Sequence, residues 1–187
     1  FKLYPKFGMK KSEARNFPGN IRLVLDPERE KYDLEKCLNP GEITIFCLHK
    51  LSSLQIEPFV VNTIREIFKQ SLEETPDLRT LMVYEEVHRL LPKFGGSGEG
   101  LTWLERGARE FRKWGLGLIL ISQVLSDFRG EIKANIGTEI QFMTKYEGDL
   151  ERIKLKYGED VYKCIVKASI GEAIIQNAEY NNGRPYI

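Results

Sequence analysis

Hydrophobic positions along the chain fall into short apolar runs that alternate with stretches of helical periodicity. Compact apolar runs at 43–48, 80–84 and 116–121 each predict a buried strand. Between the first two runs, apolar residues recur at helical spacing from Pro58 to a Thr75-Pro76-Asp77 breaker. The remaining periodicity predicts helices and then strands at 101–114, 128–136, 149–157 and 160–168, and at 139–143 and 171–176, the last being a final strand or hairpin arm.

Strands without polar alternation, separated by helices, are typical of an α/β fold with a mostly parallel sheet covered on both faces. Ligands of such sheets bind at the carboxyl ends of the strands. The pattern sharpens after residue 40, so we expect a basic edge segment at 1–40 and the core at 41–187. The start of the edge segment, residues 1–20, fits a loop with a short helix, or a nucleic-acid-binding arm.

Composition and charge exclude some classes of function without selecting one. The 187 residues are 42% hydrophobic and 29% charged, which suits one globular core, and the net charge of +1 favours neither nucleic acid nor membrane. No apolar stretch approaches the roughly 20 residues that span a bilayer, and no signal peptide is visible. Three separated cysteines and two histidines argue against zinc and a disulfide framework, and they favour a reducing, cytoplasmic compartment.

Two carboxylates, Glu85 and Glu86, follow the apolar run 80–84 directly. Adjacent carboxylates at a strand end can divide two tasks. One can hold Mg²⁺ or its bound water, and the other can polarise a water that attacks a phosphate. The simpler interpretation is a strand-to-helix junction whose glutamates favour the helix N-terminus, with His88 on the helix surface. These residues taken alone leave both interpretations open.

Arginines recur every three residues in the helix expected at 101–114. Arg106, Arg109 and Arg112 therefore lie within a sector of roughly 120° around the helix axis, beside an apolar stripe. They can be solvated residues supported by ion pairs such as Arg106 with Glu110. Alternatively, one of them is an arginine finger, which neutralises charge developing on the phosphate of a neighbouring subunit's nucleotide.

A polar pair, Ser122-Gln123, ends the strand that follows the arginine helix. Such a Gln can hydrogen-bond a γ-phosphate or the attacking water, or it can cap the next loop. The run from Ala108 to Gln123 resembles the HerA family of HerA/FtsK-type P-loop motor ATPases, in which an arginine-rich helix ends at "RKxG" before a strand ending in "SQ". Leu81–Arg89 resembles the Walker B element of P-loop NTPases, and the resemblance extends over residues 40–187.

The resemblance implies a RecA-like three-layer fold and a set of site residues. By this match Glu85 holds Mg²⁺ through a water and Glu86 is catalytic, while Gln123 acts as a sensor of the γ-phosphate. Arg112 is the first choice for the finger and Arg109 the second. The implied catalytic residues are Glu86, Arg112, Arg109 and Gln123, and the residues implied in binding ATP and Mg²⁺ are Glu85 and Ser122.

The phosphate-binding motif G-x-x-x-x-G-K-S/T does not occur in the sequence, and the glycine-rich stretch 95–100 has no lysine. Without the backbone amides and lysine of that loop, the phosphates of ATP have no cradle. The chain also starts at Phe1 in mid-pattern. We therefore expect a later part of a longer ATPase core, one that alone hydrolyses no ATP appreciably.

The resemblance implies part of an ATP-dependent DNA helicase or translocase. Such a motor works as a homo-oligomeric ring, by family habit a hexamer, contacts DNA phosphates without sequence preference, and is associated with a nuclease partner. One alternative is a type IV secretion or conjugation ATPase, whose core segments are similar. A second is a degenerate, non-catalytic ATPase-like scaffold, because Glu85 stands where the family usually has Asp and the phosphate loop is missing.

Overall fold

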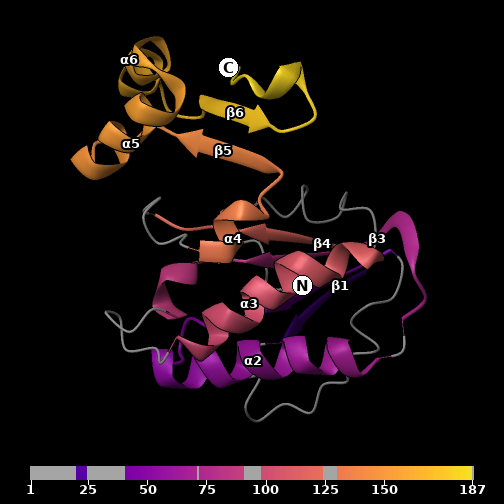
Figure 1. Ribbon diagram of the computed structural model, residues 1–187. Helices are drawn as coiled ribbons and strands as arrows, with labels where there is room; N and C mark the ends of the chain where they lie inside the picture. Colours follow the sequence, from indigo (N-terminus) through magenta and orange to yellow (C-terminus); the bar gives the residue numbers. More distant parts are fainter. Residues whose placement is uncertain (1–19, 25–40, 71, 91–97, 124–129, 187) are drawn as a thin grey trace. The chain divides into compact units, whose positions relative to one another are not determined.

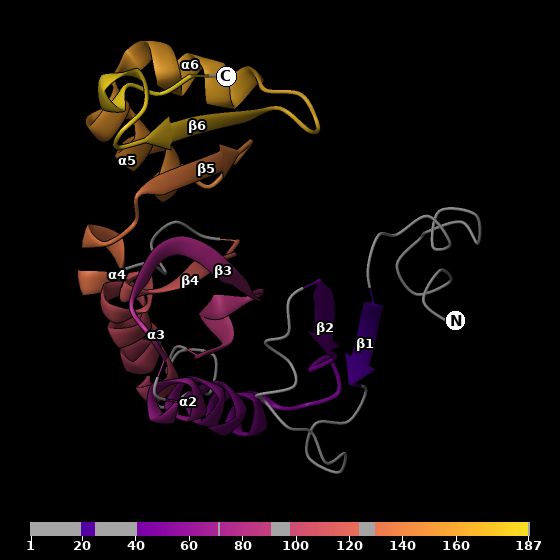
Figure 2. The ribbon, with the colours of Figure 1, turned by 90° about the vertical axis from the view of Figure 1, so that its right-hand side faces the viewer.

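A computed structural model describes most of the chain in two compact units, residues 1–52 and 53–187, which are considered separately. The residues it describes are 20–24, 41–70, 72–90, 98–123 and 130–186 (Figures 1 and 2). Most of the basic segment expected at 1–40 lies outside these residues, as does half of the glycine-rich stretch 95–100.

The first unit contains a pair of parallel strands. β1 (Asn20–Val24) pairs with β2 (Glu42–Phe46), and Asn20 lies opposite Glu42 in the register. The strand predicted at 43–48 is therefore confirmed, although it begins and ends slightly earlier.

A second pair of parallel strands forms the centre of the other unit. β3 (Thr75–Tyr84) pairs with β4 (Trp114–Leu120), and their regular register begins at Thr80 opposite Leu116. The prediction that Thr75-Pro76-Asp77 ends a helix was wrong, because these residues form the start of β3. A shift in register between Thr75 and Thr80 accommodates this segment, where a proline without an N–H interrupts no regular ladder.

Two helices lie on one side of the β3–β4 pair (Figure 1). α2 (Ser53–Lys69) packs along α3 (Glu99–Glu110), and α3 contacts β4. Pro58 lies inside α2 rather than at its start, and α2 ends before the predicted breaker. α3 also ends earlier than predicted, because a 3₁₀ turn, η4 (Phe111–Lys113), leads directly into β4.

The core of this layer is formed by apolar side chains from the two helices, a second 3₁₀ turn η2 (Val87–Leu90), and β4. Phe111 is 1% exposed and packs on the ring of Phe68, with 5.3 Å between ring centroids. The buried residues of this region include Ile56, Val60, Val61, Ile64, Ile67, Val87, Leu90, Leu104 and Leu116. The helical spacing of the α2 residues is the periodicity that predicted this helix.

The C-terminal part combines an antiparallel pair of strands with two helices. β5 (Thr138–Phe142) pairs antiparallel with β6 (Ala173–Asn177), and α5 (Glu147–Tyr157) and α6 (Glu159–Lys167) connect them. A short helix, α4 (Gly130–Ala134), precedes β5. Ile153, Ile165 and Ile174 form the buried cluster of this part. The α/β fold class is confirmed, with parallel strands flanked by helices, and so is a final strand, which pairs with β5 across two helices rather than as a hairpin arm.

Candidate active site

The carboxyl ends of β3 and β4 meet, and this brings the acidic pair beside the polar pair. Beyond the regular register, the backbone N–H of Ile121 donates to the carbonyl of Tyr84 at 2.9 Å, and the N–H of Val87 donates to the carbonyl of Ile121 at 3.1 Å. These two bonds carry the strand pairing past the last strand residues. Glu85-Glu86 and Ser122-Gln123 therefore project from the same edge of the sheet, as the sequence predicts for a parallel pair.

Glu86 adopts a left-handed backbone conformation, with φ of +54°. A non-glycine residue there costs roughly 1–2 kcal/mol, so its surroundings must hold it. The carbonyl of Glu86 accepts the N–H of Arg89 at 2.9 Å, which closes the turn into η2. Val87 and Leu90, 2% and 3% exposed, anchor that turn in the core. The buried side chains of Val87 and Leu90 thus hold the strained backbone of Glu86 in place.

The side chains of Glu86 and Gln123 are hydrogen-bonded to each other. Gln123 Nε2 donates to Glu86 Oε1 at 3.0 Å and to Oε2 at 3.2 Å. The sequence predicted both residues at the site but not this contact. An ionised carboxylate only accepts hydrogen bonds, which requires the amide nitrogen rather than the amide oxygen to face it.

Tyr84, the last residue of β3, is partly buried directly before the acidic pair, and this burial raises the pKa of its phenol. Glu85 is exposed, and no side chain among the described residues hydrogen-bonds its carboxylate. A carboxylate open to water fits a Mg²⁺ ion that keeps most of its own waters. Ser122 is half-buried next to Gln123.

The side chain of His88 reaches the same carboxylate. Its Nδ1 lies 3.1 Å from Glu86 Oε2, an ion pair whenever the imidazole is protonated, and the side chain is 17% exposed. The simpler expectation of a helix-surface histidine is therefore wrong, because η2 is a single 3₁₀ turn that directs His88 inward. No spacing in the sequence signalled this contact.

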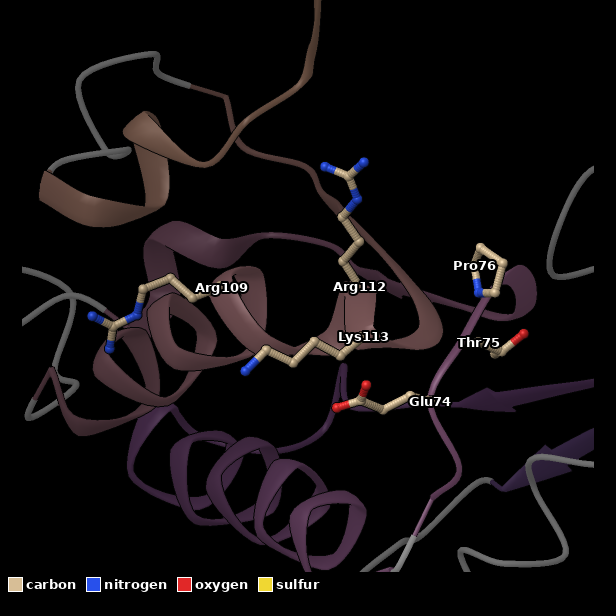
Figure 3. A pocket seen from close by; sticks show the side chains of 6 residues that line it. All are labelled: Glu74, Thr75, Pro76, Arg109, Arg112 and Lys113. Atoms are coloured by element: carbon tan, nitrogen blue, oxygen red, sulfur yellow. The ribbon is translucent and has the colours of Figure 1, made fainter.

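The arginines lie at the other end of the strands. η4 precedes β4 whereas Gln123 follows it, and the seven residues of β4 at about 3.3 Å each separate the two ends by about 20 Å. Arg109 and Arg112 are exposed and line an open groove of about 430 Å³, together with Glu74, Thr75, Pro76 and Lys113 (Figure 3). The structure therefore does not bring the arginines to Glu86 of the same chain.

Arg106 differs from the other two arginines of α3. Its Nε lies 3.1 Å from Glu110 Oε1, which confirms the predicted ion pair. Its guanidinium carbon also lies 4.3 Å from the centroid of the Phe68 ring and 5.4 Å from that of Trp103. These contacts hold the Arg106 side chain against aromatic rings of α2 and α3.

Glu57 is a buried carboxylate that the sequence interpretation missed. It lies in α2, is 6% exposed, and accepts the N–H of Gly100 at 3.0 Å. Gly98, at the N-cap of α3, provides no side-chain cap, so a residue from a neighbouring helix satisfies this terminus. Glu57 thereby fixes the start of the arginine helix.

Within the part of the chain that the structure describes, no helix is both long and apolar enough to cross a membrane. Among the same residues, no group of three or more histidine, cysteine or acidic side chains is arranged to hold a metal ion.

No family model matches the chain, but two curated proteins of Methanocaldococcus jannaschii are similar in sequence. A probable DNA double-strand break repair helicase HerA is 33% identical over 101 residues, which are 52% of this chain and 20% of that protein. A probable helicase is 28% identical over 175 residues, which are 87% of this chain and 33% of that protein. The chain thus spans a fifth to a third of the curated relatives it matches.

Solved structures share the fold over nearly the whole chain. B204, the DNA-packaging ATPase from Sulfolobus Turreted Icosahedral Virus, has a TM-score of 0.54 at 11% identity, covering 99% of this chain and 86% of that one. The genome packaging NTPase B204 from Sulfolobus turreted icosahedral virus 2, in complex with ATP-gammaS, has a TM-score of 0.53 at 12% identity, with the same coverage. The fold is that of RecA-like P-loop ATPase domains.

Proposed function

We propose that the chain is the later part of the ATPase core of a ring-forming DNA helicase or translocase of the HerA type. The meeting of Glu86 and Gln123 at the carboxyl ends of two parallel strands carries the proposal. This contact places a candidate general base, Glu86, beside the polar residue Gln123 at the edge of the sheet where α/β folds bind ligands. The similarity to two probable helicases and the fold of DNA-packaging ATPases support it.

In this proposal Glu86 acts on the attacking water. Its carboxylate orients the water and accepts its proton as the oxygen attacks the γ-phosphate. Gln123 donates to the same carboxylate and holds it over the end of β4, and together with Ser122 it contacts the phosphate or the water. Glu85 holds Mg²⁺ through a water, and the ion would supply positive charge to the phosphate oxygens.

The position of the arginines favours a finger that acts between subunits. Arg112 lies just before β4, about one strand length or roughly 20 Å from Glu86 of its own chain. Arg109, the second choice, lies in the last turn of α3 and lines the same groove. Their exposed groove is open to a neighbour (Figure 3). A subunit with the base at one edge and the finger at the other suits a head-to-tail ring, proposed here as a hexamer. DNA would bind through phosphate contacts without sequence preference.

The sequence of this chain lacks the phosphate loop, so in this proposal another segment of a longer parent protein supplies it. We therefore expect negligible ATP turnover by the chain alone. A cytoplasmic location and a nuclease partner stay predictions of the family resemblance.

The test is ATP turnover by the parent protein, with and without double-stranded DNA. Glu86→Gln is expected to lower turnover about 10²- to 10⁴-fold by removing the base. Arg112→Ala is expected to lower it about 10³- to 10⁵-fold by removing the finger. Arg106→Ala, in the same helix, is the matched control and should keep DNA-stimulated turnover in variants that remain folded.

A mixture of the two inactive proteins separates a finger acting in trans from one acting in cis. An Arg112→Ala subunit keeps its own Glu86, and a Glu86→Gln neighbour can supply an intact Arg112. Partial recovery of turnover in mixed rings is therefore expected. If Arg112→Ala is fully active, the finger lies elsewhere, with Arg109 next. If the parent shows no turnover at all, the scaffold hypothesis replaces the motor.

A further inference from the structure

His88 lies against the proposed catalytic carboxylate, closest to one of its oxygens. Its Nδ1 lies 3.1 Å from Glu86 Oε2 in a charge contact that is not aligned as a hydrogen bond, and the nitrogen is buried. The backbone turn explains the approach, because the left-handed residue Glu86 and the anchored residues Val87 and Leu90 hold His88 beneath the carboxylate. The contact is favourable only when Nδ1 carries a hydrogen.

The two partners of the carboxylate impose different constraints. Gln123 Nε2 is nearly equidistant from the two oxygens, at 3.0 and 3.2 Å, so it lies close to the bisector of the carboxylate. A donor there fixes where the group lies but leaves it free to rotate about that axis. A second contact, closest to Oε2, restricts this rotation. Oε2 then faces both Gln123 and His88, so Oε1 keeps more of its lone-pair capacity for a water.

We propose that His88 is a positioning residue that fixes the plane of the Glu86 carboxylate and so selects Oε1 as the oxygen that receives the proton of the attacking water. This inference rests on the proposed function of Glu86. The Glu86 side chain is 47% exposed, so water and nucleotide can reach it. In this inference His88 acts through the carboxylate and touches neither of them.

A wrongly oriented general base lowers kcat rather than the affinity of the enzyme for its substrate. Misplacement of a catalytic group by about 1 Å can cost on the order of 100-fold in rate. His88→Ala is therefore expected to lower kcat of the parent protein about 10- to 100-fold, with KM for ATP unchanged. His88→Asn should recover most of kcat, because its amide nitrogen can lie close to the position of Nδ1. His88→Phe keeps the ring without a donor and should stay impaired.

The kinetic outcomes separate this inference from the proposed function. Loss of turnover in Glu86→Gln with normal kcat in His88→Ala overturns the positioning role alone. Equal impairment of His88→Asn and His88→Ala, or an effect confined to KM, overturns it as well. Full turnover in Glu86→Gln overturns both proposals, since His88 acts only through that carboxylate.

The contact can also be measured in this chain without any activity. The sequence has two histidines, and His49 is exposed in the other unit, so it is an internal control. Replacing Glu86 by Gln removes a charge 3.1 Å from His88 Nδ1. The ring ¹⁵N signals of His88 should therefore move in NMR spectra, while those of His49 stay in place. Unmoved His88 signals would overturn the contact and the positioning role with it.

Discussion

Gly115 is the residue whose substitution gives the most direct test of how the arginine turn joins the sheet. It is the second residue of β4 and has φ of +66°, a conformation that L-residues rarely adopt. A Cβ at this position would lie 2.1 Å from the backbone carbonyl oxygen of Asp77 and 2.9 Å from Thr75 Cγ2. The start of β3 therefore passes directly over the glycine.

Gly115→Ala combines two costs. The left-handed conformation costs an alanine about 1–2 kcal/mol, and overpacking against a neighbour costs about 1–3 kcal/mol. The oxygen at 2.1 Å belongs to the backbone, so no side-chain rotation can relieve the contact and the two strands must separate locally. A total of about 2–5 kcal/mol corresponds to a fall in Tm of about 4–20 °C at 2–4 °C per kcal/mol.

Thermal and denaturant unfolding of Gly115→Ala measures this cost, with Gly137→Ala as the matched control. Gly137 has no atom within 4 Å of its hypothetical Cβ, so alanine there should be neutral or slightly stabilising. Equal stability of the two variants would refute the argument from steric contact. Loss of stability in Gly115→Ala alone would support the close approach of β3 to β4.

The remaining predictions concern buried polar groups. Glu57→Ala should destabilise the chain by about 1–3 kcal/mol, because it leaves the N–H of Gly100 buried and unpaired. Glu57→Gln keeps an acceptor for this N–H and should cost less. Chemical denaturation compares the two variants, and equal losses of stability would exclude the capping role. Burial raises the pKa of Tyr84, so its contribution to stability is fully present below about pH 10, the unfolded pKa, and is lost as pH rises toward the folded pKa. As the pH rises from 8 to above 10, the Tyr84→Phe variant should therefore lose less stability than the unmodified chain. An identical pH dependence of the two unfolding midpoints would contradict this.

Local sequence patterns predicted the elements well where one periodicity dominated. The apolar runs of β2 and β4 appear in the structure with shifts of one or two residues at each end, whereas β3 and α2 each begin five residues earlier than predicted. The errors lie at boundaries. Thr75-Pro76-Asp77 has the composition of a turn but joins β3, because the neighbouring strand and Gly115 provide a place for it. Trp114 continues a helical pattern but begins β4, because pairing with β3 outweighs local propensity.

The candidate site, like the secondary structure, could be predicted only in part. Its residue types and their order could be predicted, since the carboxyl ends of parallel strands lie at one edge of a sheet. The contact of Gln123 with Glu86 joins residues far apart in the sequence, so no local pattern contains it. His88 was misjudged because its burial depends on a single turn anchored by Val87 and Leu90, which the sequence alone interpreted as a helix surface.

By itself, the sequence determined the α/β class, the acidic strand end and the arginine helix, because these follow from side-chain periodicity and residue type within short segments. Only the tertiary structure decided which charges meet. It joined Gln123 and His88 to Glu86 and kept Arg112 a strand length away from it, at the opposite edge of the sheet. The physical reason is that polar contacts act over about 3 Å, and distances on that scale between remote residues are set by packing and strand register rather than by local sequence.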